Sequence, residues 1–209
     1  MAPHFDLERE FFARGLGPVA GIDEVGRGPL AGPVCAAVVI LDPDNLPDGL
    51  DDSKKLSAKR REALEAEIYA RALAVAVALS PAEEIDRVNI REATLLSMRR
   101  AALALSVTPG AVLVDGNDPP ALPWPTRAVV KGDATSLSIA AASIIAKCAR
   151  DRLMKRLDGI YPGYGFGRDA GYPTAAHRAA LLELGPCPEH RRSFKPLRLL
   201  LDARPDWSR

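Results

Sequence analysis

Two adjacent carboxylates, Asp23 and Glu24, stand near the end of an apolar segment and directly before a Gly-Arg-Gly turn. Carboxylates gather where a divalent cation must be held, because hard cations prefer oxygen ligands. Glycines let the backbone approach a sugar or a phosphate closely, and the arginine between them adds a charged fork. The segment therefore indicates metal-dependent chemistry on a phosphodiester, with Gly26, Arg27 and Gly28 as substrate-binding residues.

Two further acids, Asp115 and Asp133, each follow a short apolar segment. Each acid alone has a simpler interpretation, because Asp115 begins a common Asp-Gly-Asn turn and Asp133 could cap a helix that begins near Thr135. The first acidic pair could likewise lie on the surface. A shared site explains them better together, since each acid ends a segment that one sheet would bring to the same edge.

Clustered carboxylates repel one another, so one or more of them should bind protons until a cation arrives. Mg²⁺ or Mn²⁺ would relieve this repulsion, and two such ions about 4 Å apart can activate a water and stabilise a leaving oxygen. No histidine with suitable spacing stands nearby, which argues against zinc. Neighbouring residues of a strand point to opposite faces, so Asp23 and Glu24 can share a site only if their strand ends or bulges there.

The surrounding sequence predicts the elements that position these acids. Apolar runs predict five strands, over residues 19–25, 32–41, 73–79, 111–115 and 126–130. Helical spacing predicts helices over 57–70, from a capping box at Ser80 to about 105 with a break near Asn89, over 135–157 and over 174–184. Residues 161–172 read as an ordered loop. We therefore expect an α/β fold with a mixed sheet flanked by helices and a C-terminal helical and loop extension.

The composition fits one such domain of 209 residues, 47% of them hydrophobic. We expect a lead-in over 1–18, the domain over 19–198 and a tail over 199–209. Residues 143–209 carry 13 Lys/Arg and 7 Asp/Glu, whereas the rest of the chain carries 15 and 20. A basic part facing an acidic part suits a polyanion beside a carboxylate cluster, although ordinary solvated helix faces give the same pattern.

Three cysteines, Cys35, Cys148 and Cys187, lie far apart without a C-x-x-C motif. This spacing argues against a zinc site or a disulfide framework and fits a reducing compartment. No apolar run reaches membrane-spanning length, and the N-terminus has no signal-type apolar core. We therefore expect a cytoplasmic protein that binds no membrane, and a monomer.

The chain resembles bacterial ribonuclease HII, the type 2 ribonuclease H family, over about Val19 to Arg198. The resemblance rests on a series of blocks whose order and spacing are specific: Gly21–Val34, Asp52-Ser-Lys-Lys-Leu56, Val88-Asn-Ile90 with Ala93-Thr-Leu-Leu96, Val114-Asp-Gly-Asn117, Lys131-Gly-Asp-Ala134 with Ser143-Ile-Ile-Ala-Lys147, Gly171-Tyr-Pro-Thr174 and His190-Arg-Arg-Ser-Phe194.

The resemblance implies a ribonuclease H-like fold and endonucleolytic cleavage of RNA in RNA–DNA hybrids. It also implies incision 5′ of single ribonucleotides embedded in duplex DNA, as in ribonucleotide excision repair, giving 5′-phosphate and 3′-hydroxyl ends. The family's catalytic, metal-binding tetrad, which uses two Mn²⁺ or Mg²⁺ ions, corresponds to Asp23, Glu24, Asp115 and Asp133. Its Gly-Arg-Gly motif corresponds to Gly26, Arg27 and Gly28, and its junction-sensing tyrosine to Tyr172.

A protein distinguishes RNA from DNA at one nucleotide through the 2′-hydroxyl or the sugar pucker. The backbone of a Gly-Arg-Gly turn suits that contact, although an isolated Gly-x-Gly is often a plain tight turn. A methyl group at Gly28 would obstruct the sugar or strain a positive-φ turn. Tyr172 could stack on the neighbouring deoxyribose, or it could only pack its own loop.

Lys54 and Lys55 lie on a loop that leads into a basic helix. Such a cluster suits phosphates, and a solvated helix end would look the same. The chain departs from the family before Tyr172, where Arg168-Asp169-Ala170 stands in place of the lysines or histidine that are often present. We expect this departure to affect substrate affinity rather than the class of reaction.

Three alternatives remain open from sequence. Ribonuclease HIII has a similar catalytic domain but an additional N-terminal domain, for which the roughly twenty residues before the first strand are too few. A non-catalytic hybrid-binding module would not need an intact acidic tetrad, since clustered acids without metal repel a nucleic acid. Another nuclease or integrase of ribonuclease H-like fold would share the paired acids but not the Gly-Arg-Gly block.

Overall fold

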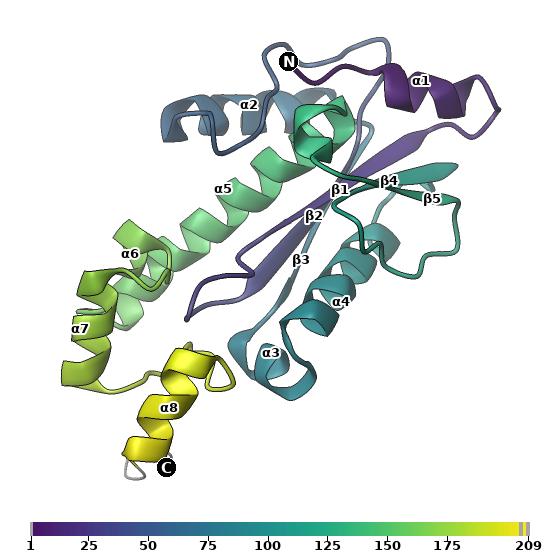
Figure 1. Ribbon diagram of the computed structural model, residues 1–209. Coiled ribbons are helices and arrows are strands. Elements are labelled where there is room, and N and C mark those ends of the chain that lie inside the picture. Colours follow the sequence, from purple (N-terminus) through teal and green to yellow (C-terminus); the bar gives the residue numbers. More distant parts are fainter. Residues whose placement is uncertain (1, 205–206, 208–209) are drawn as a thin grey trace.

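The computed structural model describes residues 2–204 and 207 and shows a mixed sheet with helices on both faces (Figure 1). The strands are β1 (Val19–Val25), β2 (Val34–Ile40), β3 (Ala74–Ser80), β4 (Ala111–Asp115) and β5 (Thr126–Val129). They lie in the order β3-β2-β1-β4-β5. β2 is antiparallel to β1 and β3, whereas β4 is parallel to β1 and β5. The predicted mixed five-stranded sheet is confirmed.

The helices are α1 (Asp6–Phe12), α2 (Ala58–Arg71), α3 (Ala82–Val88), α4 (Ile90–Leu103), α5 (Leu137–Ile160), α6 (Phe166–Asp169), α7 (Ala175–Leu184) and α8 (Lys195–Ala203), with a 3-10 turn η1 (Gly132–Ala134). Sequence periodicity did not predict α1, α8 or the short α6 inside the expected loop. Within residues 2–204 and 207, no helix combines the length and apolar character that a membrane span requires.

The break between α3 and α4 confirms one local prediction and corrects another. Asn89 has a φ of +70° and caps α4, because its side chain accepts a hydrogen bond from the backbone N–H of Glu92. The capping box at Ser80 is wrong, since α3 begins without a side-chain cap. The Ser80 hydroxyl instead donates to the carbonyl of Ala93 at 3.0 Å and so ties the end of β3 to α4.

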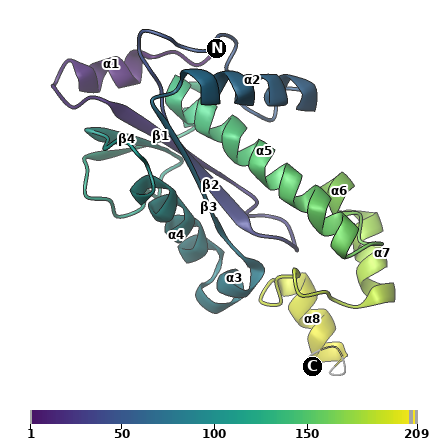
Figure 2. The same ribbon diagram turned by 180° about the vertical axis from the view of Figure 1, so that it is seen from behind.

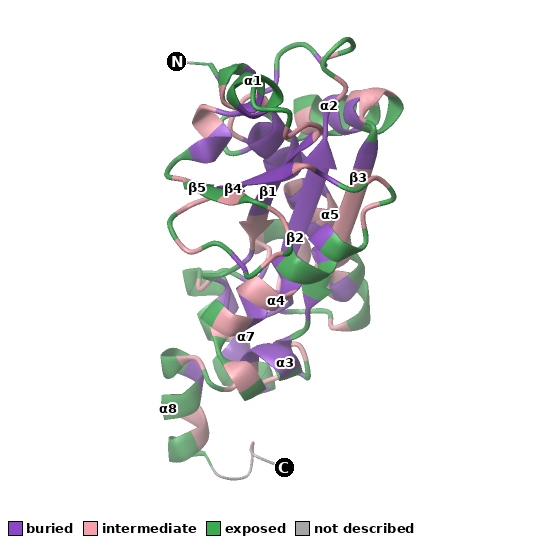
Figure 3. Ribbon diagram, turned by 90° about the vertical axis from the view of Figure 1, so that its right-hand side faces the viewer, coloured by how far each residue is buried: buried purple, intermediate pink, exposed green. Residues whose placement is uncertain are grey.

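Two apolar layers enclose the sheet. α2 and α5 cover one face and α4 covers the other (Figures 1 and 2). Along β2, Ala37 and Val39 pack into the α5 layer, whereas Ala36 and Val38 pack into the α4 layer. β2 is therefore buried along its whole length (Figure 3), as its continuous apolar run predicts.

The N-terminal end of α5 is fixed by a residue from the lead-in. The buried carboxylate of Glu8 in α1 accepts hydrogen bonds from the Ser136 hydroxyl at 2.6 Å and from the Ser138 backbone N–H at 2.9 Å. α6, α7 and α8 follow at the other end of α5 (Figure 1). The division into 1–18, 19–198 and 199–209 stays a prediction; α8 spans its second boundary, and residues 205, 206, 208 and 209 lie outside the described residues.

Candidate active site

The carboxyl ends of the parallel strands β1 and β4 bring two of the predicted acids to one edge of the sheet. Ile22 of β1 pairs with Val114 of β4, and Asp23 and Asp115 are the next residues of the two strands. A carboxyl edge shared by parallel strands is the usual place for a site in such a sheet. The sequence argument that joined these acids through the sheet is therefore supported by the strand register.

The other two acids reach the same edge by different routes. The backbone N–H of Gly132 donates to Asp115 Oδ1 at 2.7 Å, which holds η1, and with it Asp133, beside the end of β4. Glu24 follows Asp23 directly, and its backbone N–H donates to Asp23 Oδ1 at 2.7 Å. The carboxylates of β1, β4 and η1 therefore lie around one edge of the sheet.

The bulge expected at Asp23 and Glu24 is not present. The ladder between β1 and β2 continues regularly through Glu24 to Val25. Asp23 therefore lies on the α5 face, next to Ser143, whereas Glu24 lies on the opposite face. There Glu24 and Asp115 line a depression of about 50 Å³ together with residues of α4 and the β4–β5 connection. The acids straddle the sheet edge, because both stand within two residues of the end of β1.

Burial and mutual repulsion make this edge costly to charge. Burial, followed by the charges of Glu24 and Asp115, raises the pKa of Asp23 well above its ordinary value. Burial also raises the pKa of Glu24, and the Arg27 guanidinium, 3.6 Å from the Glu24 carboxylate, opposes that rise. The pKa of Asp133 is raised by burial and then by the charge of Asp115. The edge would therefore be stabilised by a cation.

The donor set fits a hard divalent cation. All four side chains offer carboxylate oxygens, which Mg²⁺ and Mn²⁺ prefer. Within the part of the chain that the structure describes, no three acidic, histidine or cysteine side chains already converge as closely as a bound ion requires. A bound cation would therefore have to draw the carboxylates together, which their raised pKa values lead us to expect.

The two predicted lysines occupy different environments. Lys55 Nζ lies 2.9 Å from Asp51 Oδ1 on the surface and points its charge into that pair. Lys54 faces the acidic edge: burial alone would lower its pKa, but the charges of Asp52 and Asp133 and of the strand-end acids outweigh burial and raise it. Lys54 is therefore placed to meet a phosphate beside the carboxylates, and Lys55 is not.

A buried arginine, Arg191, holds the Gly-Arg-Gly turn from behind. Its guanidinium donates to the carbonyls of Gly26, of Arg27 at 3.0 Å and of Gly32 at 2.9 Å, and it is completely buried. Because these carbonyls point inward, the turn is left with its other backbone groups toward the solvent. The positive φ belongs to Gly26, at +95°, and not to Gly28, which corrects the sequence expectation.

A second buried arginine, Arg150 of α5, links this turn to the loop that carries Tyr172. It donates to the carbonyls of Ala31 at 3.1 Å, Pro33 at 2.9 Å and Ala170 at 3.0 Å. The pKa values of Arg150 and Arg191 are both lowered by burial, that of Arg191 to about 9. Their six backbone partners are carbonyl oxygens, so the two cations organise the loops and not an ion pair.

Tyr172 lies next to the Gly-Arg-Gly turn. Its side chain is 43% exposed, and a methyl group added to Gly28 would lie 3.6 Å from Tyr172 Cε1. The departure from the family pattern supports this loop, because the Asp169 carboxylate accepts hydrogen bonds from the Gly171 N–H and the Thr174 hydroxyl, each at 3.0 Å. The structure therefore brings the two predicted recognition elements together.

Sequence reasoning missed both buried arginines, although one of them left a signal. Arg150 follows Ala146 by four residues and precedes Leu153 by three, so it falls on the predicted apolar stripe of the long helix. A cation on an apolar stripe indicates a buried partner. Arg191 lies in an irregular basic segment, where nothing in the pattern separates it from its neighbour Arg192.

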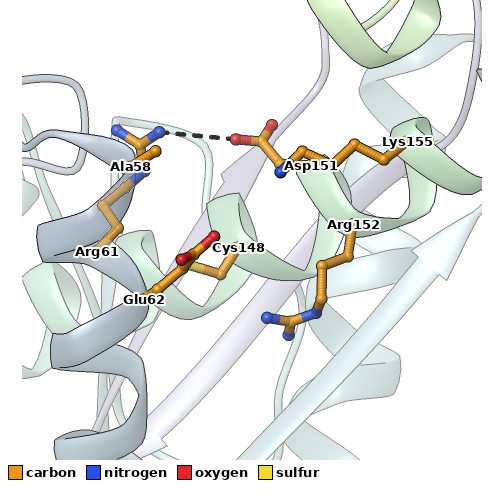
Figure 4. A pocket seen from close by; sticks show the side chains of 7 residues that line it. All are labelled: Ala58, Arg61, Glu62, Cys148, Asp151, Arg152 and Lys155. Atoms are coloured by element: carbon orange, nitrogen blue, oxygen red, sulfur yellow. Dashed lines mark ion pairs between the residues drawn. The ribbon is translucent and has the colours of Figure 1, made fainter.

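A separate depression lies between α2 and α5 (Figure 4). It holds about 30 Å³, room for a water but not for a nucleotide. Arg61 lies 3.7 Å from Asp151 across it, as the dashed line in Figure 4 marks. Burial raises the pKa of Cys148, in its wall, to about 11, so this thiol is not a nucleophile at neutral pH. All three cysteines are buried and unpaired, as predicted.

Comparisons with known proteins agree with this geometry. The Ribonuclease HII family model matches residues 20–197. The ribonuclease HII of Ruegeria sp. (strain TM1040) is 58% identical over 200 residues, which cover 95% of this chain and 87% of that protein. The crystal structure of ribonuclease H2 from Pyrococcus horikoshii OT3 is similar with a TM-score of 0.77 at 28% identity, covering 88% of this chain and 97% of that chain.

The crystal structure of Bst-RNase HIII in complex with Mn²⁺ has a TM-score of 0.68 at 20% identity and covers 91% of this chain and 72% of that chain. At this identity the likeness concerns the fold alone. Together the two solved structures confirm the ribonuclease H-like fold that the motif resemblance implies.

Proposed function

The chain belongs to the ribonuclease HII family, whose members are metal-dependent nucleases acting on RNA–DNA hybrids, and on that premise we propose its specific reaction. The enzyme cleaves the RNA strand of hybrids and also incises 5′ of single ribonucleotides embedded in duplex DNA. The products carry 5′-phosphate and 3′-hydroxyl ends. This activity would begin ribonucleotide excision repair.

One observation carries the proposal. The Gly26–Gly28 turn and Tyr172 lie side by side and next to the carboxylate edge. A nucleotide whose scissile phosphate meets the carboxylates would then present its sugar to the turn and the following sugar to the tyrosine ring. Backbone groups of the turn are small enough to hydrogen-bond a 2′-hydroxyl, and an aromatic ring suits a deoxyribose that lacks one.

Asp23, Glu24, Asp115 and Asp133 would hold two divalent ions, Mn²⁺ or Mg²⁺, as the catalytic residues of the site. When bound, such ions supply an activated water and stabilise the leaving oxygen of the phosphodiester. The chain's own groups then orient the substrate. Lys54 meets a phosphate next to the acids, and Arg27, which is half exposed, can turn from Glu24 to a second phosphate.

Further expectations follow from the same proposal. A buried carboxylate cluster with raised pKa values would repel a nucleic acid if it never bound a metal, which disfavours a purely binding module. A cytoplasmic location and a monomeric state remain predictions from sequence.

The test is cleavage of a DNA duplex that carries one ribonucleotide, with Mg²⁺, with Mn²⁺ and with a chelator. We expect metal-dependent incision on the 5′ side of the ribonucleotide, read from product mobility and end labelling. A fully DNA duplex of the same sequence serves as the uncut control. Cleavage of continuous hybrid without cleavage of the single-ribonucleotide duplex would contradict the proposed specificity and leave family membership intact.

A further inference from the structure

Two histidines outside the proposed reaction, His177 and His190, lie in contact beneath the Tyr172 loop. They are 0% and 1% exposed. The ring of Tyr164 lies 4.9 Å from that of His190, and the ring of Phe166 lies 5.5 Å from that of His177, centre to centre. Buried polar groups must find hydrogen-bond partners, so the protons of this pair are fixed by their neighbours.

The two rings form a continuous chain of hydrogen bonds. His190 Nδ1 lies 3.1 Å from the backbone nitrogen of Cys187. His190 Nε2 lies 3.1 Å from His177 Nε2. His177 Nδ1 lies 2.9 Å from the backbone carbonyl oxygen of Tyr172. The chain therefore begins at one backbone group, passes through both imidazoles and ends on the residue proposed to sense the junction.

The ends of the chain determine where its protons sit. The Cys187 N–H can only donate, so His190 Nδ1 accepts and its proton is on Nε2. That proton is donated to His177 Nε2, which leaves the His177 proton on Nδ1, where it is donated to the Tyr172 carbonyl. Reading from the carbonyl, which can only accept, gives the same assignment. One arrangement with one proton on each ring satisfies every group.

We propose that His177 is a positioning residue for Tyr172, held in the required tautomer by His190, and that this chain helps set the preference for an RNA–DNA junction. The inference rests on the proposed role of Tyr172 in sensing that junction. His177 acts on the backbone of Tyr172 itself, whose carbonyl also accepts from the Thr174 N–H at 2.8 Å. Both lone pairs of this oxygen are used, so loss of His177 frees the residue that faces Gly28.

Two substitutions separate this role from simple core packing. The amide of asparagine reaches about as far as Nδ1, so His177→Asn can still donate to the Tyr172 carbonyl. The amide of glutamine reaches about as far as Nε2, so His177→Gln can meet His190 but not that carbonyl. The matched control is Tyr164→Phe, which removes a buried hydrogen bond of 2.7 Å to the Gly185 carbonyl in the same cluster without touching Tyr172.

The readout is the ratio of the single-turnover rates on a single-ribonucleotide duplex and on a continuous hybrid, with the melting temperature of each variant. One backbone hydrogen bond is worth roughly a five- to tenfold change, so His177→Gln should lower the ratio by that factor. His177→Asn should keep a ratio near that of the wild type. Tyr164→Phe should lower the melting temperature and leave the ratio unchanged. Equal ratios for both His177 variants, or a ratio that follows melting temperature across all three, would overturn the proposal.

A second measurement does not depend on activity. Nitrogen-15 NMR of the imidazoles distinguishes the two neutral tautomers, and we expect the proton on Nδ1 of His177 and on Nε2 of His190. The opposite tautomer at either ring would overturn the chain even if cleavage were normal. A wild type with the expected tautomers and no preference for the junction would contradict the proposed function of Tyr172 instead.

Discussion

The two glycines of the recognition turn should fail in different ways when each is replaced by alanine. Gly26 has a φ of +95°, and a Cβ built there would lie 2.2 Å from Arg150 Nε. Gly28 is not among the residues with a positive φ, and its Cβ would meet only Tyr172 Cε1, at an ordinary 3.6 Å. The first change therefore strains the fold, and the second places a methyl group between the turn and the tyrosine.

The magnitudes follow from these contacts. A side chain held at a sparsely populated φ costs about 1–3 kcal/mol, and overpacking a buried contact costs about 1–3 kcal/mol more. Gly26→Ala should therefore lower the free energy of unfolding by roughly 2–6 kcal/mol and the melting temperature by roughly 5–20 °C. Gly28→Ala leaves the backbone unstrained, so its free energy of unfolding should change by less than about 1 kcal/mol.

Cleavage should rank the variants in the opposite way to their stability. A methyl group at Gly28 would hold the sugar away from the turn and remove at least one hydrogen bond, which is about a tenfold loss of rate on a single-ribonucleotide duplex. The assay compares single-turnover cleavage and thermal unfolding of both variants at a temperature where Gly26→Ala is still folded. Normal cleavage by Gly28→Ala would refute the reasoning and place recognition of the 2′-hydroxyl elsewhere. Unchanged stability of Gly26→Ala would refute the described turn.

Three further outcomes test the site. Asp23→Asn should reduce cleavage by several orders of magnitude and raise the melting temperature of the metal-free protein, because it removes a buried charge among other acids; comparable turnover at saturating Mg²⁺ would remove Asp23 from the site. Tyr172→Ala should slow incision at single ribonucleotides about ten- to hundredfold more than cleavage of continuous hybrid, and equal losses would make it a packing residue. Burial lowers the pKa of His190 from 6.5 to about 4, so the folded state disfavours its charged form. Stability should be complete above pH 6.5 and fall by on the order of 3 kcal/mol as the pH drops to about 4, a slope that His190→Asn should flatten in urea titrations.

The sheet and the positions of the acids were accessible from sequence, because both follow from local patterns. The continuous apolar run of Val34–Ile40 predicts a strand covered on both faces, and it is buried throughout. Asp115 and Asp133 each end an apolar segment, so a shared sheet edge brings them together without knowledge of side-chain contacts. Charge pattern also led to Lys54, which faces the acids, but it could not separate Lys54 from Lys55.

Two local predictions failed because tertiary contacts decided them. The capping pattern at Ser80 is a sound local signal, but its hydroxyl is drawn to the backbone of α4 instead. The bulge expected at Asp23 assumed that both carboxylates needed the same face of the sheet. The regular ladder shows that a site at the end of a strand can be reached from both faces, with Asp115 of the next strand between them.

The polar groups that hold the recognition loops were the part that sequence could not supply. Arg191 lies more than 160 residues from the carbonyls of Gly26 and Arg27 that it binds, and Arg150 lies 117 residues from that of Pro33. No local pattern encodes such pairs, because carbonyl oxygens carry no residue identity. A buried cation satisfied by carbonyls is tolerated only if all of its donors are met, so these side chains fix loop geometry more narrowly than apolar packing would. The arrangement explains why a turn of small residues can hold one shape against a substrate: its rigidity comes from distant arginines beneath it and not from its own sequence.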